Sequence, residues 1–277
     1  DRNQESLALY ELSVATPSRE RRARLLEKLN RFQDSISLCE EIELEPLDQE
    51  EREFARFFGP RVGRKSGLNH GLPVLQKYDI PTETIEVSHD LERVEECAVR
   101  YYEQKGARCF YVENALFNGL FGLVFWDIIF SSVPGAFFNP FQRGPADLHT
   151  GHFIQNRRSK IERRLAEIAD ADELRRRVFN VFNQKAGITN DFVYWGFWSE
   201  ELLHLSVERI APQQCQAVFS RMLTDLKNNT SGFPDLIMFY DDDYKLVEIK
   251  GPGDKFQKNQ ERWFQYFMDQ CIPASLV

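Results

Sequence analysis

The chain has 277 residues, of which 42% are hydrophobic and 28% charged, and its formal net charge is −8. That composition supports one large or two modest hydrophobic cores. Because we find neither a signal peptide nor an apolar run long enough to span a membrane, we expect an intracellular globular enzyme. A first residue of Asp rather than Met suggests a fragment of a longer chain.

Five cysteines are scattered singly through the chain. An odd number without CxxC spacing argues against a disulfide framework and a structural zinc site, so we expect reduced thiols. His149 and His152 could chelate a metal, but neither a third ligand nor a helical context accompanies them, and chance spacing is the better interpretation.

Residues 1–66 are predicted to form amphipathic helices that look like the end of a helical-repeat array, although no internal period is convincing. A loop containing Gly and Pro is expected over 59–73, and 67–79 is assigned as the linker to a second domain. The helices are expected at 5–14, 18–32 and 48–57.

Residues 80–277 are predicted to form that second domain, a small mixed sheet wrapped by helices. The apolar run 115–130 is too short and too interrupted for a membrane span, so it is expected to be a buried helix. A helical insertion is expected at about 159–226. The other expected elements are a helix at 90–105, a strand at 109–112, hairpin strands at 236–240 and 244–250, and a helix at 255–270.

The hairpin carries an Asp … Glu-x-Lys pattern that begins with Asp235. Because strand side chains alternate between faces, Glu248 and Lys250 share one face about 7 Å apart, while Ile249 points towards the core. The alternative is an aspartate that caps a turn and an ordinary charge pair on a solvated face, since short patterns of this kind occur by chance.

Hydrolysis of a phosphodiester bond requires a nucleophilic water and stabilisation of charge on the phosphoryl and leaving oxygens. Oxygen-ligated Mg²⁺ or Mn²⁺, as one or two ions, supplies both. In this hypothesis Asp235 and Glu248 are metal ligands and the carbonyl of Ile249 is a further ligand. Lys250 orients the attacking water or helps to deprotonate it.

Residues from two other elements give this pattern a context. Gln260 is predicted to lie within the apolar stripe of the helix that follows the hairpin, facing the strands. The alternative is a glutamine at the edge of that stripe that binds water. Glu113 stands at the start of the buried helix and could provide a third metal ligand; the alternative is an ordinary helix-start glutamate. Asp127 is about 21 Å further along that helix, so it is interpreted as a structural residue.

Several separated blocks together resemble the Fanconi-anaemia-associated nuclease family over roughly residues 80–277. They are YYE at 101–103, CFYVE at 109–113, FWDIIF at 125–130, GFPDL at 232–236 and LVEIKGPGD at 246–254. The resemblance implies the virus-type replication-repair (VRR-NUC) version of the PD-(D/E)xK restriction-endonuclease-like fold, an α/β (mixed α+β) core.

The resemblance also implies a structure-specific DNA nuclease that cuts 5′ flaps and branched DNA, with 5′-to-3′ exonuclease action and Mg²⁺ or Mn²⁺ as cofactor. Matched residue by residue, it implies metal carboxylates at Glu113, Asp235 and Glu248, a backbone ligand at Ile249 and the catalytic lysine at Lys250.

A departure from the family concerns the basic residue that grips a 5′ phosphate in members from animals. That position falls on Asn259 in this chain, so the resemblance does not imply recognition of a terminal phosphate.

Positively charged residues are clustered along the chain although its net charge is negative. The local clusters determine the electrostatic potential at a DNA-binding surface. Acidic residues are interleaved with the arginines of 157–164, so a solvated, salt-bridged helix face is the alternative to a phosphate-binding face. The candidate DNA contacts are Arg61, Arg64, Lys65, Arg157, Arg158, Lys160, Arg163 and Arg164.

Two other functions stay open. One is a Holliday-junction resolvase, because stand-alone modules with this hairpin resemble such enzymes and usually work as homodimers. The extra helical segments here instead favour a monomer that grips a flap. A non-catalytic scaffold would bind a repair partner through its helices, although the complete Asp, Glu and Lys set argues against loss of the catalytic site.

We expect branched DNA as substrate in repair such as interstrand crosslink repair. We also expect a repair protein as recruiter, no membrane partner, and a location in the nucleus of a eukaryote or the cytoplasm of a bacterium.

Overall fold

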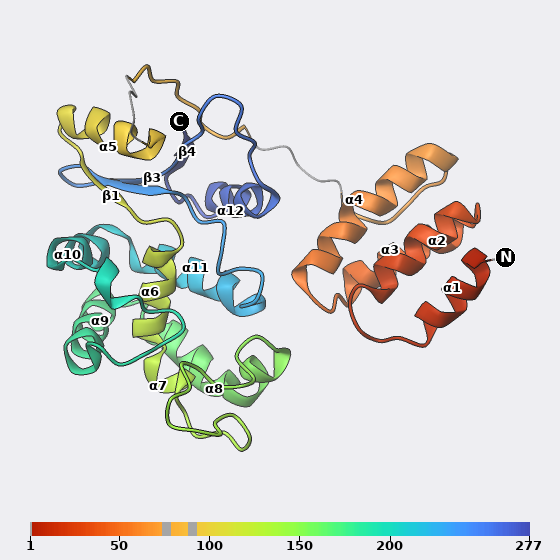
Figure 1. The fold of residues 1–277 in the computed structure, drawn as a ribbon, viewed down its shortest axis with the longest axis horizontal. Helices are drawn as coiled ribbons and strands as arrows, with labels where there is room; N and C mark the ends of the chain where they lie inside the picture. The colour runs from red at the N-terminus through yellow and green to blue at the C-terminus, as the bar shows by residue number, and fades with distance from the viewer. Residues whose placement is uncertain (1, 74–78, 88–92) are drawn as a thin grey trace. The chain divides into compact units, whose positions relative to one another are not determined.

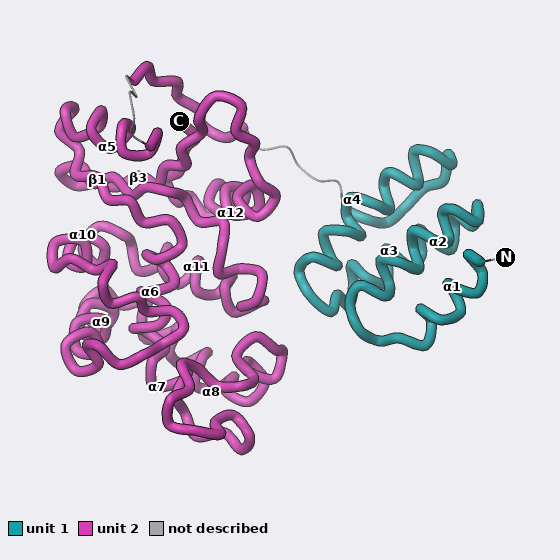
Figure 2. Tube along the Cα trace, in the orientation of Figure 1, with its two compact units in different colours: residues 1–77 teal, residues 78–277 magenta. Residues whose placement is uncertain are grey.

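The computed structural model describes residues 2–73, 79–87 and 93–277 (Figure 1). The chain divides into two compact units, Asp1–Lys77 and Tyr78–Val277, which Figure 2 distinguishes by colour. Parts of the predicted linker (74–78) and of the predicted helix at 90–105 (90–92) lie outside the described residues. In the described ranges, every helix is too short or too polar to cross a lipid bilayer.

Unit 1 is built from helices whose apolar faces enclose a core that includes Ile36, Cys39 and Phe58. Helix α4 begins where the Asp48 side chain accepts a hydrogen bond from the Glu51 N–H at 2.8 Å, satisfying a free amide of the first turn. The helices of this unit are α1 (Arg2–Glu11), α2 (Ser18–Lys28), α3 (Phe32–Leu44) and α4 (Gln49–Ser66).

The helices of unit 1 differ from the sequence prediction, since α1 and α2 end earlier than expected, at Glu11 and Lys28, and two larger differences concern α3 and α4. Helix α3 was not predicted, because its buried apolar positions are interleaved with the glutamates of an acidic tract. Helix α4 was expected to end before Gly59, but it continues through Pro60 to Ser66. Gly59 has a packing role there, since a Cβ at this position would stand 2.1 Å from Leu72 Cδ1.

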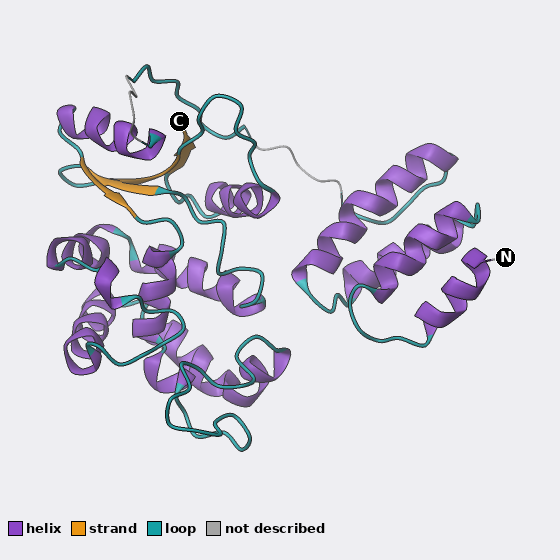
Figure 3. Ribbon diagram, in the orientation of Figure 1, coloured by secondary structure: helices purple, strands orange, loops and turns teal. Residues whose placement is uncertain are grey.

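In unit 2 the strands β1 (Arg108–Tyr111), β2 (Leu236–Phe239), β3 (Tyr244–Glu248) and β4 (Ala274–Leu276) form one sheet in the order β1-β2-β3-β4 (Figure 3). Strands β1 and β3 are each antiparallel to β2, whereas β4 runs parallel to β3. The sheet is therefore mixed, as predicted, and β4 near the C-terminus is a strand that was not among the expected elements.

The two faces of the sheet pack against different elements, because successive side chains alternate. Leu236, Met238 and Val247 belong to a small core with α5 (Val94–Gln104), which covers one face. Ile237 and Leu246 belong to the large core with α12 (Lys258–Asp269). Figure 1 shows α5 and α12 on opposite sides of the strands.

The remaining helices of unit 2 enclose the rest of the large core. The expected buried helix at 115–130 is broken at Phe125, whose backbone leaves the helical region at φ −101° and ψ 15°. These helices are α6 (Ala115–Val124), α7 (Trp126–Ile129), α8 (Gly151–Glu167), α9 (Ala171–Lys185), α10 (Glu200–Arg209) and α11 (Pro212–Thr224), with a 3₁₀ turn η1 (Trp195–Phe197).

Helix α12 begins at Lys258 rather than near 255. Asp254, which directly precedes the expected start of this helix, instead accepts a hydrogen bond from the Gly251 N–H at 3.0 Å and closes a turn after β3. The N-terminal end of α12 is held by Gln260, whose Oε1 accepts from the Gln257 N–H at 3.0 Å.

Candidate active site

The register of the hairpin brings two acidic residues together. Leu236 is paired with Val247 and Ile237 with Leu246, so one further step places Asp235 opposite Glu248. Directly opposed residues on an antiparallel pair have Cβ atoms about 5 Å apart. Glu248 is 1% exposed, while Asp235 is half-buried.

The carboxylate of Glu248 has two differently bonded oxygens. Its Oε1 accepts hydrogen bonds from Lys250 Nζ, at 2.6 Å, and from Gln260 Nε2. The Gln260 Oε1 accepts from Lys250 Nζ at 3.1 Å, so these three side chains form one network. Among the residues that the structure describes, none donates a hydrogen bond to Oε2 of Glu248, which is buried.

Burial makes both opposed carboxylates weaker acids than usual. It raises the pKa of Glu248 to about 7, an effect that the Lys250 ammonium reduces and the charge of Asp235 reinforces. Burial also raises the pKa of Asp235, although the Ile249 N–H donates to its Oδ2 at 3.0 Å. The charges of Glu95 and Glu113 raise the Asp235 pKa further. A cation at this point would relieve that repulsion.

Glu113 directly follows β1 and adopts a left-handed backbone conformation, with φ 40°. Its N–H and that of Val112 both donate to the main-chain oxygen of Asp235, at 3.0 and 2.7 Å. A left-handed glutamate is a strained residue, and such strain is common at functional sites. The backbone of the third predicted carboxylate is therefore fixed directly to that of Asp235.

Asn114 ties the segment before β2 to the end of β1. Its Oδ1 accepts from the N–H groups of Gly232 and Phe233, at 2.9 and 3.3 Å. These residues lead directly into Asp235, so the Asn114 side chain sets where that carboxylate leaves the sheet.

Gly232 allows this segment to approach α12. Its φ is +91°, and a Cβ at this position would stand 2.8 Å from the main-chain carbon of Asn259. We expect Gly232→Ala to lower the free energy of unfolding by about 1–3 kcal/mol more than the matched change Gly253→Ala. Gly253 has the same backbone conformation, with φ +92°, but nothing within 4 Å of such a Cβ.

Urea denaturation of both variants measures that difference. Equal losses would mean that the close approach to α12 contributes nothing beyond the backbone conformation that the two glycines share.

The donor atoms fit a hard divalent cation, but they do not form a closed set. Within the described ranges, no group of three or more His, Cys, Asp or Glu side chains is gathered in a way that could hold an ion. Oxygen ligands nevertheless suit Mg²⁺ or Mn²⁺, and Oε2 of Glu248 is a buried acceptor without a donor. A bound cation would satisfy that atom.

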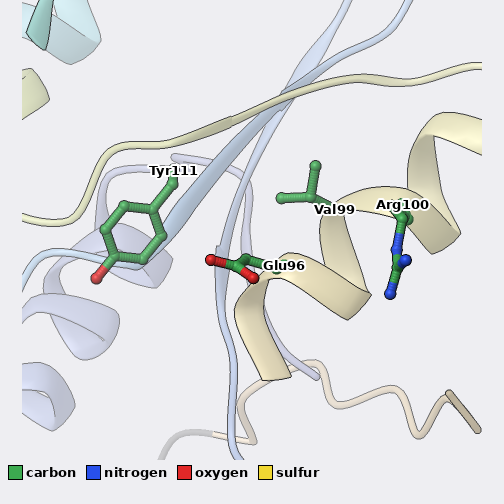
Figure 4. A pocket seen from close by; sticks show the side chains of 4 residues that line it. All are labelled: Glu96, Val99, Arg100 and Tyr111. Atoms are coloured by element: carbon green, nitrogen blue, oxygen red, sulfur yellow. The ribbon is translucent and has the colours of Figure 1, made fainter. Parts of the chain in front are cut away.

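A pocket of about 360 Å³ lies on the α5 side of the sheet and is lined by Glu96, Val99, Arg100 and Tyr111 (Figure 4). It adjoins the acidic residues, because Tyr111 Oη donates to Glu113 Oε2 at 3.0 Å. The guanidinium of Arg93 lies 5.4 Å from the centre of the Tyr111 ring.

Two of the predicted DNA contacts are instead buried inside unit 2, which corrects the sequence interpretation. Arg157 has a fully buried side chain that pairs with Asp147 at 2.9 Å and donates to the Ile128 carbonyl at 3.1 Å. Arg164 is 7% exposed and binds both carboxylate oxygens of Asp127, each at 2.8 Å. Phosphates cannot reach either guanidinium without breaking these pairs.

The other predicted DNA contacts lie at the surface. On α8, Arg158, Lys160 and Arg163 are exposed. On α4, Arg64 is exposed, whereas Arg61 and Lys65 both pair with Glu27, at 2.5 and 3.0 Å. These three α4 residues lie on the last turns of a helix rather than on the loop that was expected.

Sequence reasoning missed Tyr111 and Asn114 as neighbours of the acidic residues. A weak signal for Tyr111 was present, because it lies only two positions before Glu113 in the sequence. Asn114 had no comparable signal, since its partners Gly232 and Phe233 are far away in the sequence.

Comparison with known proteins relates this chain to one group of nucleases. The VRR-NUC domain model matches residues 169–277. A Fanconi-associated nuclease 1 homologue of Pseudomonas aeruginosa is 36% identical over 97% of this chain and 48% of its own length. The Fanconi-associated nuclease 1 of Danio rerio is 34% identical over 61% of this chain and 18% of its own length.

A solved structure is similar throughout. The crystal structure of paFAN1 bound to a 5′ flap DNA with a gap has a TM-score of 0.85 and 34% identity, covering 99% of this chain and 51% of that one. This chain thus spans about half of the Pseudomonas relative and less of the animal one.

Proposed function

We propose that this chain, which belongs to the Fanconi-associated nuclease family, is the catalytic part of a structure-specific DNA nuclease. It hydrolyses phosphodiester bonds in 5′ flaps and other branched DNA during repair, including interstrand crosslink repair, with 5′-to-3′ exonuclease action. The observation that carries this proposal is the opposed pair Asp235 and Glu248, which lies at the end of the hairpin with the Lys250 ammonium bonded to Glu248. The flap DNA bound by paFAN1 supports the choice of substrate.

The proposal assigns one or two Mg²⁺ or Mn²⁺ ions to Asp235, Glu248, the carbonyl of Ile249 and Glu113. When bound, such an ion makes water a stronger nucleophile and neutralises charge on the phosphoryl oxygens. Burial around Glu248 excludes bulk water from its side of the site, which strengthens every charge interaction there.

In this proposal Lys250 acts on the attacking water, and Gln260 holds Lys250 in position. The Lys250 ammonium is held between Glu248 Oε1 and Gln260 Oε1, so its position is fixed before DNA binds. A fixed ammonium can donate to the water and to the phosphate, which makes its role more positional than basic. Gln260 keeps both partners in place through its own two bonds to them.

The proposed contacts to DNA phosphates are the basic residues at the surface, and they exclude the buried Arg157 and Arg164. They are Arg158, Lys160, Arg163, Arg61, Arg64 and Lys65. It treats the protein as an intracellular monomer that a repair protein recruits, in the nucleus of a eukaryote or the cytoplasm of a bacterium. Asn259 is uncharged where animal relatives carry a basic residue, so a terminal 5′ phosphate is not assigned a site there.

The test is a panel of end-labelled 5′ flap, fork, nicked and four-way-junction DNAs, incubated with the chain and Mn²⁺ and mapped for cut positions. We expect the flap to be cut fastest, near its branch point. Preferential, symmetric cutting of the four-way junction would instead support the resolvase alternative. If none of the substrates is cut with either Mn²⁺ or Mg²⁺, the protein is not a nuclease.

A further inference from the structure

Glu113 is held by side chains on both sides of its carboxylate. Tyr111 Oη donates to Oε2 at 3.0 Å, and Asn114 Nδ2 approaches Oε1 at 3.4 Å. The second distance is near the upper limit for a hydrogen bond, whereas the first is ordinary. Oε2 is therefore the anchored oxygen, and Oε1 is the oxygen that remains free to accept another partner.

The backbone of Glu113 has little freedom to change the position of this carboxylate. Its N–H and that of Val112 are both bound to the Asp235 carbonyl, and its φ of 40° lies in the left-handed region. The remaining freedom is rotation about the side-chain bonds. The Tyr111 hydroxyl restricts that rotation by holding one oxygen.

The Tyr111 ring has contacts of its own, besides the bonds of its hydroxyl group to Glu113 and Arg93. It lines the pocket with Glu96 and Val99, and the Arg93 guanidinium lies over it at 5.4 Å (Figure 4). Removing only the hydroxyl therefore leaves the packing of the ring intact. This separation makes the hydrogen bond testable without disturbing the fold.

We propose that Tyr111 is a positioning residue that presents Glu113 to the divalent ion of the nuclease site. This inference rests on the proposed function, because it needs a metal bound by Glu113 together with Asp235 and Glu248. Residues that hydrogen-bond to metal-ligating carboxylates orient them, and removing such partners typically costs 10–100-fold in metal affinity or activity. Tyr111 holds Oε2, which would leave Oε1 available to a bound ion.

The experiment measures Mn²⁺ binding by isothermal titration calorimetry on the full chain without DNA, so it does not depend on cleavage. The proteins are the unsubstituted chain, Tyr111→Phe, Glu113→Gln and the double variant. Tyr101→Phe is the matched control, since it removes a tyrosine hydroxyl that is bonded to the Lys105 ammonium rather than to Glu113. Circular dichroism checks that each variant is folded.

We expect Tyr111→Phe to raise the Kd for Mn²⁺ about tenfold. In the Glu113→Gln background the same change has no further effect, because the carboxylate that Tyr111 positions is gone. Tyr101→Phe binds Mn²⁺ as the unsubstituted chain does.

Two results would overturn the inference while leaving the proposed function in place. One is an unchanged Kd in Tyr111→Phe, and the other is an equal loss with and without Glu113. Failure of the unsubstituted chain to bind Mn²⁺ would overturn the metal-dependent function as well, so the two failures are distinguishable.

Discussion

Asp235→Asn, Glu248→Gln and Lys250→Ala are each expected to slow flap cleavage by at least about 10³-fold. The first two remove charge from the opposed pair that faces the proposed ion, and the third removes the ammonium fixed by Glu248 and Gln260. Because these groups act as a unit, the double variants are expected to lose little more than the single ones. Single-turnover cleavage of a labelled 5′ flap measures the effect.

Lys245→Ala is the matched control for Lys250→Ala. It removes an ammonium from β3, the strand that leads into Lys250, but from a residue paired with Met238, away from Glu248. We expect this variant to retain nearly full activity. Flap binding by the Asp235→Asn protein should also be nearly unchanged, and an active Lys250→Ala protein would contradict the assigned role of the lysine.

Asp147→Asn is expected to destabilise unit 2 by about 3–5 kcal/mol, because it leaves the Arg157 guanidinium buried without a counter-charge. The Arg157 side chain is 0% exposed and its partner Asp147 only 16%. One nitrogen of Arg157, Nη2, already lacks a hydrogen-bond partner. The free energy of unfolding in urea measures this loss.

Asp172→Asn provides the comparison, since Asp172 is 95% exposed and pairs with Arg175 at 3.8 Å. We expect a change below about 0.5 kcal/mol there. If Asp147→Asn cost no more than this control, the Arg157 pair would not stabilise the fold.

The pair of Asp147 and Arg157 also makes the stability of unit 2 depend on pH, and the direction of this dependence follows from the pKa of Asp147. Burial opposes ionisation of Asp147, but its bonds to Arg157 and Asn156 lower its pKa overall. A lowered pKa means that the pair stabilises the fold above the ordinary pKa of aspartate, and that this contribution is lost as the pH falls through the lowered value.

The alternation rule placed Glu248, Lys250 and Ile249 on their faces from sequence alone, because a strand has a fixed period of two. The mixed sheet and the predicted fold class followed from the same segments. The position of Asp235 opposite Glu248 could not be predicted from either strand alone, because it depends on the register of β2 against β3.

Arg157 and Arg164 show where a linear sequence is insufficient. Both belong to a helix rich in charged residues, and their exposed neighbours have the same chemical character. Their burial depends on Asp147 and Asp127, which approach α8 only in the folded chain. The left-handed backbone of Glu113 is equally a product of folding, since the Asp235 carbonyl holds it in place.

The most direct test of the central claim is cleavage of a 5′ flap by protein that has been dialysed against a chelator. We predict no cleavage by the metal-free chain, recovery on addition of Mn²⁺, and no recovery in Glu248→Gln. Cleavage that persists in excess chelator, or Mn²⁺-restored activity in Glu248→Gln, would contradict an ion held by this hairpin.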